Sequence, residues 1–526
     1  MPRPRFFLAL LLIALTSLVI PTREATAKIK LPPVLSSHMV LQREMPVPIW
    51  GTAAPGEKIT VSFRDQEKSA TADAQGKWLV KLDPLTAGGP DPLKIAGADT
   101  ATLEDVLVGE VWVGSGQSNM DIDVKSFTKG DEVLEKMAAQ TYPRLRLIRA
   151  GNPGWLEATP KNISNTSAML FSFGLPLYKE LDVPVGLVVG AVCGTPSGYW
   201  LSEEAFQGDV ACKEVIAKFA KTYSFEQAQK SYEQALAKWE KDVATAKQKG
   251  EKRLPGKPNP PEKPGECRGK VGDLYEARIR PFMPFAIRGV LWDQGEGGAG
   301  EGGTAICGVD QYTLMGALIR GWRKEWGQGD FPFIYVQKSS GGGCAWDPAD
   351  PVTCRAEKFA PQPAKVPSPS EGLGRETYIR IMQYPNTAMV TASDLGSGTH
   401  PVNKSGYGLR AARVALGMVY GRKLEIYGPL YQSCEVEGNK IRLKFTHVGQ
   451  GLAARHADKL QGFTIAGNDN AFYWADAAID GDTVVVSSGK VAKPAAVRYA
   501  WSYMHPWANL FNKDGLPALT FRTDSW

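Results

Sequence analysis

Histidine is scarce in this chain, with five histidines among 526 residues. The sequence contains no His-Glu-x-x-His stretch and no Cys-x-x-Cys pair, which would indicate a zinc-protease helix or a structural zinc site. Residues 295–300 satisfy the Gly-x-Gly-x-x-Gly pattern, but glycines continue through Gly302 and Gly303 without an evident helix start. This favours a loop over a dinucleotide site. We therefore expect no metal and no cofactor.

A large excess of charge of one sign is also missing. The formal net charge is +6, and the lysines and glutamates are interspersed along the chain. The sequence has no basic stripe with interleaved aromatic residues, which is the pattern that a nucleic-acid-binding protein would show. We expect no nucleic-acid partner.

The long apolar run of the sequence lies near the N-terminus, from Phe6 to Ile20. Arg3 and Arg5 precede it and Ala25-Thr-Ala27 follows it, which predicts a signal peptide over residues 1–27 and a secreted or periplasmic mature protein. A retained membrane anchor is the alternative, but about fifteen apolar residues are fewer than the ~20 that span a bilayer. We expect no membrane association after cleavage.

Seven cysteines in an exported chain allow up to three disulfides with one cysteine left over. The sequence does not determine which cysteines pair. Cys344 with Cys354 would close a local loop, and Cys212 with Cys267 would bracket a helical insertion.

The mature chain of roughly 500 residues exceeds a single hydrophobic core, so we expect two to four domains. Residues 28–104 contain short alternating runs such as Ile59–Phe63, separated by proline, glycine and aspartate, and predict an N-terminal β-sandwich domain. Alternation returns in residues 424–526, as in Lys440–Phe445, and predicts a C-terminal β-domain.

Residues 105–423 instead alternate apolar strands with helical stretches, which predicts an α/β fold with a parallel sheet. The expected strands are Val106–Val113, Val183–Val189, Ile287–Trp292, Phe333–Gln337 and Thr387–Thr391, and the expected helices include Gln311–Trp326 and Gly406–Val419. Residues 205–270 form an expected helical insertion, with a solvated helix over 225–248 and a proline-rich tail over 254–265.

A serine follows the first of these strands. Residues 109–120 read Gly-Glu-Val-Trp-Val-Gly-Ser-Gly-Gln-Ser-Asn-Met, an apolar strand that enters a glycine-containing turn ending at Ser118. A serine nucleophile needs an imidazole within hydrogen-bond reach and donors for the oxyanion. Ser118 is therefore a candidate nucleophile, and His400, in the loop Asp394–Pro401, is the candidate base. The alternative is that Ser118 caps the helix that follows it.

Several motifs occur in a specific order along almost the whole mature chain. They are Met39–Arg43, Val47–Gly51, Gly109–Trp112, Ser115–Met120, Gly194–Pro196, Trp292 with Gln294–Glu296, His400–Pro401 with Asn403–Lys404, Arg375–Glu376, Val497–Trp501 and Gly515–Ala518. In this combination the chain resembles the sialate O-acetylesterase family of SGNH-type serine esterases.

The resemblance implies an SGNH-like esterase domain in residues 105–423, flanked by the two β-domains. It implies removal of O-acetyl groups from sialic acids or related acetylated sugars through an acyl-serine intermediate. Ser118 would attack the ester, and His400 would take and later return the proton. The candidate oxyanion donors are the backbone amide N–H groups of Ser118 and Gly194 and the side chain of Gln294. The alternatives are a tight turn after a strand for Gly194 and a capped strand end for Gln294.

The chain departs from the family pattern at three positions. The family usually has an asparagine shortly after Gln-Gly-Glu, whereas glycines follow Glu296 here, and Tyr378 stands where a glutamine is usual. The aspartate that SGNH esterases often carry three residues before the histidine is Ser397 here. The acid that orients His400 is therefore Asp394, folded back across the loop, or Glu296, or neither in a serine and histidine dyad.

Two rival functions stay open at this point. One is the same ester hydrolysis on acetylated plant or algal polysaccharide. The other is a noncatalytic sugar-binding protein on an esterase scaffold, which the missing asparagine and aspartate motivate.

Overall fold

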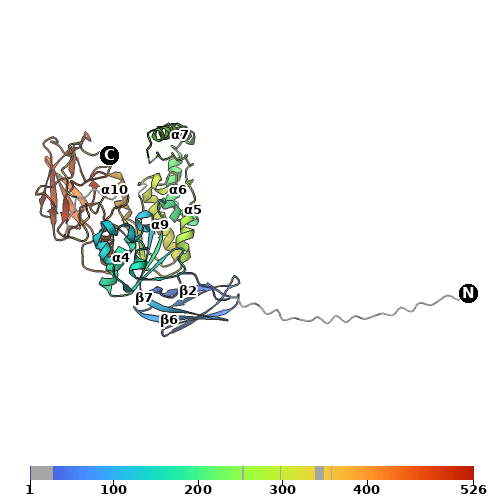
Figure 1. The fold of residues 1–526 in the computed structure, drawn as a ribbon. Helices are drawn as coiled ribbons and strands as arrows, with labels where there is room; N and C mark the ends of the chain where they lie inside the picture. Colours follow the sequence, from blue (N-terminus) through green and yellow to red (C-terminus); the bar gives the residue numbers. More distant parts are fainter. Residues whose placement is uncertain (2–27, 252–253, 296–297, 338–346, 348, 357) are drawn as a thin grey trace.

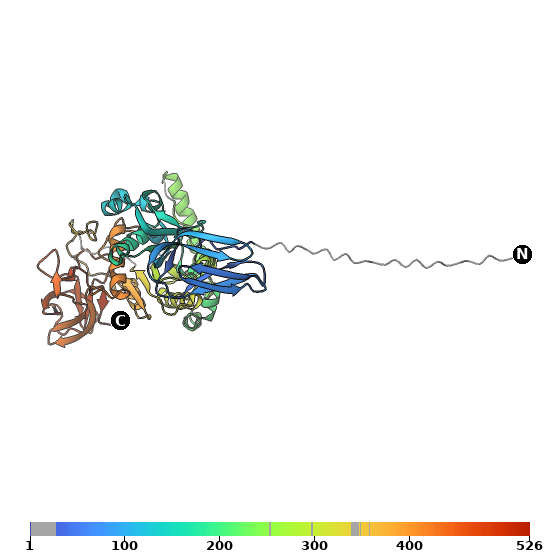
Figure 2. The same ribbon diagram turned by 90° about the horizontal axis from the view of Figure 1, so that it is seen from below.

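The computed structural model describes the chain except for residues 2–27, 252–253, 296–297, 338–346, 348 and 357 (Figure 1). The N-terminal strands form the lower end of the molecule in Figure 1, the C-terminal strands lie on its left, and helix α7 lies at the top. The N-terminal and C-terminal strands again lie on different sides of the central helices in Figure 2. The predicted signal peptide falls outside the described residues.

One long strand, β7 (Thr100–Gly116), is the centre of the fold. Its second half pairs in parallel with β10 (Val185–Ala191) on one side and with β11 (Gly289–Asp293) on the other. The central strands follow the order β13-β12-β11-β7-β10-β8-β9. Along this order β8 and β9 pair antiparallel, and every other neighbouring pair is parallel. The outer strands are β8 (Tyr142–Arg149), β9 (Leu156–Ala158), β12 (Phe333–Val336) and β13 (Thr387–Val390). The predicted α/β fold is confirmed in a mixed sheet whose central strands are parallel, and each of the five expected strands overlaps an observed one.

The two faces of this sheet are covered by different helices. Successive strand residues point to opposite faces, so Val111 and Val113 join one hydrophobic core while Trp112 joins the other. Helix α9 (Gln311–Trp326) contributes to the first core, and the mutually packed helices α4 (Ala168–Leu181) and α11 (Lys404–Met418) contribute to the second. Because both faces are covered, the strands read as continuous apolar runs.

Local signals set the ends of the predicted helices. Helix α9 has the predicted bounds, because the Asp310 side chain accepts a hydrogen bond from the backbone N–H of Thr313 at its start. Gly327 ends it with a φ of 68°. Helix α7 (Phe225–Gln248) also has the predicted bounds, and most of its side chains are solvated.

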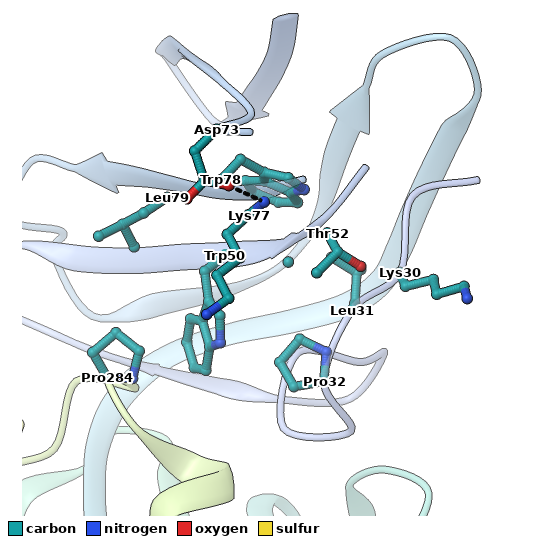
Figure 3. Close-up of a pocket in the computed structure, with 11 residues that line it drawn as sticks. Lys30, Leu31, Pro32, Trp50, Thr52, Asp73, Lys77, Trp78, Leu79 and Pro284 are labelled. Carbon is teal, nitrogen blue, oxygen red and sulfur yellow. Dashed lines mark hydrogen bonds between the residues drawn. The ribbon is translucent and has the colours of Figure 1, made fainter. Parts of the chain in front are cut away.

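Strand β7 also carries the chain from the N-terminal strands into the central sheet. Its first half pairs antiparallel with β6 (Gly88–Ala96) and in parallel with β1 (Val40–Gln42). The predicted domain boundary between residues 104 and 105 therefore falls inside a single strand. Strand β3 (Lys58–Phe63) joins β6 to β4 (Gln66–Thr71). Strands β2 (Val47–Thr52) and β5 (Lys77–Leu82) form a separate antiparallel pair, whose outer side chains line a hollow near Pro284 (Figure 3).

The chain after α11 forms antiparallel strands around a third hydrophobic core, as the alternating sequence predicted. One sheet has the order β14-β15-β20-β19, another has the order β18-β17-β21-β23, and β16 pairs with β22. The strands are β14 (Leu430–Glu437), β15 (Lys440–Thr446), β16 (Leu452–Ala454), β17 (Phe463–Ala466), β18 (Tyr473–Trp474), β19 (Asp476–Asp480), β20 (Thr483–Ser487), β21 (Ala496–Tyr499), β22 (Leu510–Asn512) and β23 (Phe521–Arg522).

Short helices connect the larger elements. They are α1 (Ser118–Asp121), η1 (Val124–Ser126), η2 (Thr128–Gly130), α2 (Glu132–Ala138), α3 (Pro160–Ile163), η3 (Ser197–Trp200), α5 (Glu203–Gly208), α6 (Val210–Ala220), η4 (Tyr275–Ile279), η5 (Arg280–Phe282), α8 (Glu301–Thr304) and α10 (Leu373–Ile381). Helices α6 and α7 lie within residues 205–270, where the helical insertion was predicted, and α5 begins two residues before them.

The cysteines differ from the sequence-based expectation. Cys212 and Cys267 are both free thiols, so the expected pairing between them is not formed. Cys344, and with it the expected pairing to Cys354, lies outside the described residues. Across the described part of the chain, no helix is both long enough and apolar enough to span a membrane.

Candidate active site

Ser118 lies at a sharp turn beyond the carboxyl end of β7. Gly116 makes the turn with a φ of 124°, and a Cβ there would lie 2.1 Å from the backbone carbonyl oxygen of Asp293. The backbone N–H of Gln117 donates to that same oxygen over 2.9 Å. Helix α1 then begins at Ser118, whose side chain is buried with 7% of its surface exposed. The turn is thus fixed against β11 through a contact that only glycine permits.

The structure separates the two roles considered for Ser118. Gln117, and not Ser118, occupies the N-cap position of α1, and no side-chain capping hydrogen bond is formed there. The alternative that Ser118 caps the helix is therefore wrong. As the first residue of the helix, Ser118 has a backbone N–H that no intrahelical bond uses, as an oxyanion donor requires.

Gly194 lies in the turn after the neighbouring strand β10. Its φ is 71°, its position is exposed, and no atom lies within 4 Å of where a Cβ would be. The turn is attached to the Ser118 turn, because the backbone N–H of Cys193 donates to the Asp121 carboxylate over 3.0 Å. The backbone N–H of Val192 also donates to the carbonyl oxygen of Gly116 over 3.2 Å. Ser118 and Gly194 therefore belong to one connected strand-end region.

Gln294 follows β11, on the other side of β7, and is buried. Its side-chain amide donates to the carbonyl oxygen of Thr195 over 2.8 Å and so supports the Gly194 turn from the opposite side. An amide nitrogen carries a second hydrogen, which leaves one donor for a ligand. Tyr378, which stands at the family's glutamine position, is buried with its hydroxyl 3.5 Å from the Gln294 carbonyl oxygen. That position packs inside the protein beneath Gln294.

His400 is exposed in the loop between β13 and α11, and two side chains join this loop to the Ser118 turn. The Asn119 side chain donates to the carbonyl oxygen of Thr399 over 2.9 Å, and its own oxygen accepts from the Lys404 ammonium over 2.6 Å. The Lys404 ammonium also lies 4.7 Å from the centre of the Phe127 ring. The residue after Ser118 thus bonds to the residue before His400.

Asp394 is fully buried and forms an ion pair with Arg410 of α11. Its two carboxylate oxygens accept from the guanidinium over 3.3 and 3.0 Å, and Arg410 also donates to the carbonyl oxygen of Thr391. This pair fastens the start of the His400 loop to α11. The role of Asp394 as the acid that orients His400 stays a prediction. Glu296, the alternative acid, lies outside the described residues.

Asp121 at the end of α1 is a site residue that the sequence did not suggest. Its carboxylate pairs with Arg149 over 2.5 Å, and Arg149 also pairs with Asp123 over 2.8 Å. Burial first, and then the hydrogen bond to Asp121, raise the pKa of the Cys193 thiol to about 11. The thiol is therefore protonated at neutral pH and does not act as a competing nucleophile beside Gly194.

The other four histidines are accounted for elsewhere. His447 bonds to Glu425 over 2.6 Å and His38 bonds to Asp105 over 2.6 Å. His456 is exposed beside the Phe359 ring, and His505 is buried, which lowers its pKa well below the usual value, with the Arg375 charge adding to the effect. These residues have structural or surface positions.

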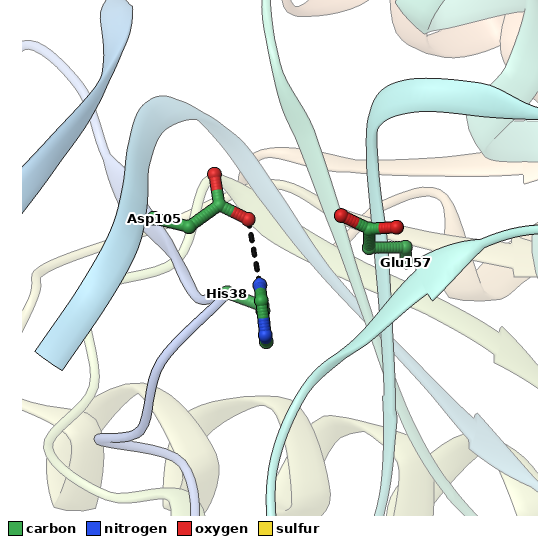
Figure 4. A group of neighbouring side chains, drawn as sticks. All are labelled: His38, Asp105 and Glu157. Atoms are coloured by element: carbon green, nitrogen blue, oxygen red, sulfur yellow. Dashed lines mark hydrogen bonds and ion pairs between the residues drawn. The ribbon is translucent and has the colours of Figure 1, made fainter.

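One group of possible metal ligands lies at the junction of the N-terminal strands and the central sheet (Figure 4). Ligand atoms of His38, Asp105 and Glu157 lie within 4.8 Å of one another. The Arg146 guanidinium already bonds to Asp105 over 2.7 Å and lies 4.0 Å from Glu157. Because this buried cation occupies the acidic groups, the residues do not fit a metal site, and we assign none.

Comparisons with known proteins show what the whole chain is similar to. No family model matches the chain. Sialate O-acetylesterase from Rattus norvegicus is 28% identical over 95% of this chain and 94% of its own length. Sialate O-acetylesterase from Homo sapiens is 26% identical over 89% of this chain and 86% of its own length.

A solved structure is also similar to this chain over nearly its whole length. The crystal structure of a carbohydrate acetylesterase from Xanthomonas citri is 30% identical, has a TM-score of 0.72, and is matched over 95% of this chain and 100% of that one. The chain therefore belongs with the carbohydrate acetylesterases, is similar over most of its length to sialate O-acetylesterases, and is a carboxylic-ester hydrolase of the serine type.

Proposed function

We propose that this enzyme removes O-acetyl groups from sialic acids or related acetylated sugars through an acyl-serine intermediate on Ser118. The observation that carries the proposal is the hydrogen bond from Asn119 to Thr399, because it couples the Ser118 turn to the His400 loop. The turn of Gly194 is coupled to the same region through Asp121. A nucleophile, a base and an oxyanion donor therefore lie on three attached segments.

In the first step, His400 accepts the hydroxyl proton of Ser118 while the serine oxygen forms a bond to the acetyl carbonyl carbon. The carbonyl oxygen becomes an oxyanion, which the backbone N–H groups of Ser118 and Gly194 and the second side-chain hydrogen of Gln294 stabilise. Collapse of this intermediate breaks the bond to the sugar oxygen, and His400 donates its proton to the leaving sugar hydroxyl. The acetyl group is then esterified to Ser118.

In the second step, His400 accepts a proton from water as the water oxygen bonds to the acetyl carbon. The same donors hold the second oxyanion, and the proton returns to the Ser118 oxygen as acetate leaves. We propose Asp394 as the acid that fixes the His400 tautomer, acting from within its pair with Arg410, since a carboxylate has lone pairs for more than one donor. Glu296 and a dyad without an acid are the competing arrangements.

The proposed substrate class is inferred from the names of the relatives, which are a sialate O-acetylesterase and a carbohydrate acetylesterase. Acetylated plant or algal polysaccharide is the second candidate substrate, since the protein from Xanthomonas citri is named as a carbohydrate acetylesterase without a particular sugar. The basic and apolar N-terminus supports export, and we propose a secreted or periplasmic enzyme.

A paired assay tests the proposal. Purified protein should hydrolyse an aryl acetate, and Ser118→Ala should lower kcat by several orders of magnitude, of the order of 10⁶ where a serine acts with its base as a unit. A folded Ser118→Ala protein that keeps its activity contradicts the serine mechanism. Product analysis on acetylated sialic acids beside acetylated xylan then identifies the substrate, and binding of either sugar without any turnover would support the sugar-binding protein instead.

A further inference from the structure

A groove lies along the outer surface of the β2–β5 sheet, away from the candidate active site. Two adjoining hollows make up the groove, with volumes of about 550 Å³ and about 320 Å³. Leu79 and Pro284 line both of them. Pro284 precedes β11, whereas Gln294 follows the carboxyl end of that strand. The groove and the esterase site therefore lie at opposite edges of the central sheet. Pockets that bind small molecules have volumes of ~300–1,000 Å³.

An aromatic ring lies in the groove. Trp50 of β2 is partly exposed between Pro32 and Pro284, and the extended Lys77 side chain ends beside it (Figure 3). Trp50 also packs edge-on against Phe285 with ring centres 6.4 Å apart, which limits its movement. A fixed, partly exposed indole offers a flat apolar surface with a polar N–H, which suits a ligand that has apolar and polar faces. A sugar ring has both.

The strand alternation places cations along the same groove. The exposed side chains of β5 are Lys77, Leu79 and Lys81, while Trp78 and Val80 between them point inward. Neither lysine forms an ion pair within the described part of the chain. At a rise of ~3.4 Å per residue, the two lysines stand roughly 14 Å apart along the strand. Leu79, with 43% of its surface exposed, lies between them.

Asp73, an acid that lines the groove, forms no ion pair with either lysine within the described part of the chain. Asp73 lies in the turn before β5, and one of its oxygens accepts from the backbone N–H groups of Gln75 and Lys77 over 2.9 and 2.8 Å. Its carboxylate is thus engaged in holding the turn. The groove therefore combines an apolar floor with unpaired positive charge, which matches a ligand that carries carboxylates.

We propose that this groove is a second, noncatalytic binding site for a carboxylated saccharide chain. A sugar ring stacks on Trp50, Lys77 and Lys81 bind carboxylates of the chain, and the exposed Thr52 hydroxyl meets sugar hydroxyls at the rim. Such a site would hold the enzyme on a glycan surface while the opposite edge of the sheet performs hydrolysis. It does not depend on the esterase proposal, because binding is measured without turnover.

Calorimetric titration of the full chain tests the site. The probes are sialyllactose, trigalacturonic acid, and lactose as the neutral counterpart of the first. We expect at least one carboxylated probe to bind, and lactose to bind about tenfold more weakly or worse, since a charge-assisted hydrogen bond contributes that much. The probe that binds tells whether sialylated glycans or uronic-acid chains supply the carboxylate. Absence of binding by both, or equal binding of lactose, overturns the proposal.

Two sets of variants locate the binding. The double variant Lys77→Glu with Lys81→Glu should weaken binding at least about tenfold. The matched control, Lys58→Glu with Lys94→Glu, makes the same charge change at exposed positions of β3 and β6 and should leave the affinity unchanged. Trp50→Ala should also weaken binding, whereas Trp50→Phe keeps an aromatic surface and should retain most of it. If the double lysine variant of the groove and its control bind with equal affinity, the ligand binds elsewhere and the proposal is overturned. This test holds even if the Trp50 variants fail to fold.

Discussion

The side-chain amide of Asn119 donates a hydrogen bond to the backbone carbonyl oxygen of Thr399 over 2.9 Å, across 280 positions of the chain. Asn119 follows Ser118, and Thr399 precedes His400. The oxygen of the same amide accepts from the buried Lys404 ammonium. One side chain therefore holds the turn of the proposed nucleophile to the loop of the proposed base.

We expect Asn119→Ala to lower kcat by about 10² while KM changes little, because a displacement of ~1 Å between reacting groups costs this much. Steady-state kinetics with an aryl acetate measure the effect. Asn119→Asp still accepts from Lys404 but cannot donate to Thr399, so it should be impaired as well. Wild-type activity in a folded Asn119→Asp protein would mean that the bond to Thr399 is dispensable.

The candidate acids are separated by their amide variants. If Asp394 orients the imidazole, Asp394→Asn should lower kcat by as much as ~10⁴, and Glu296→Gln should have a small effect. If Asp394 only holds the loop through Arg410, breaking this buried ion pair should cost about 3 kcal/mol of stability while the folded fraction keeps its kcat. Kinetics beside thermal unfolding distinguish these results. A large effect of Glu296→Gln alone would assign the role to Glu296, and small effects of both on kcat would support a dyad.

Gly116→Ala should destabilise the protein and disrupt the Ser118 turn. The added Cβ would meet the Asp293 carbonyl oxygen at 2.1 Å, and the φ of 124° is itself unfavourable for alanine. Gly56→Ala is the matched control, because Gly56 has a φ of 79° but open space around the added atom. We expect Gly116→Ala to lose about 2 kcal/mol more than the control, as measured by the shift in melting temperature. Equal shifts would show that the contact with Asp293 relaxes freely.

The pH dependence of Cys193 modification follows from its raised pKa of about 11. Only the thiolate reacts with iodoacetamide, so about one thiol in a thousand is reactive at pH 8, and labelling should accelerate as the pH rises toward 11. Asp121→Asn removes the acceptor and its charge, so labelling at pH 8 should become faster. Mass spectrometry of the labelled peptide, with free cysteine as the reference, measures both rates. Labelling of the wild type as fast as free cysteine at pH 8 would contradict the hydrogen bond to Asp121.

Much of the fold follows from local patterns in the sequence. The helices over 225–248 and 311–326 were predicted with the observed bounds, because periodic apolar residues and an N-capping side chain act within a few positions. The central strands were predicted as apolar runs because a parallel sheet is covered on both faces. The placement of Ser118, Gly194 and Gln294 after these strands follows from the same runs, since parallel strands end at one edge.

The partners of the site residues could not be predicted in this way. The sequence left Asp394 as a candidate partner of His400, and the structure shows it paired with Arg410 on the following helix. Asp121 bonds to Cys193 across two strand ends, and β7 continues through a boundary predicted from composition. Each of these depends on which side chains the packed sheet and helices bring within hydrogen-bond distance. The sequence by itself therefore determined the elements, their order and the residues at the strand ends, because local periodicity encodes them. Only the tertiary structure decided which charges and amides pair, because those contacts join positions distant in the chain and depend on the geometry of packing.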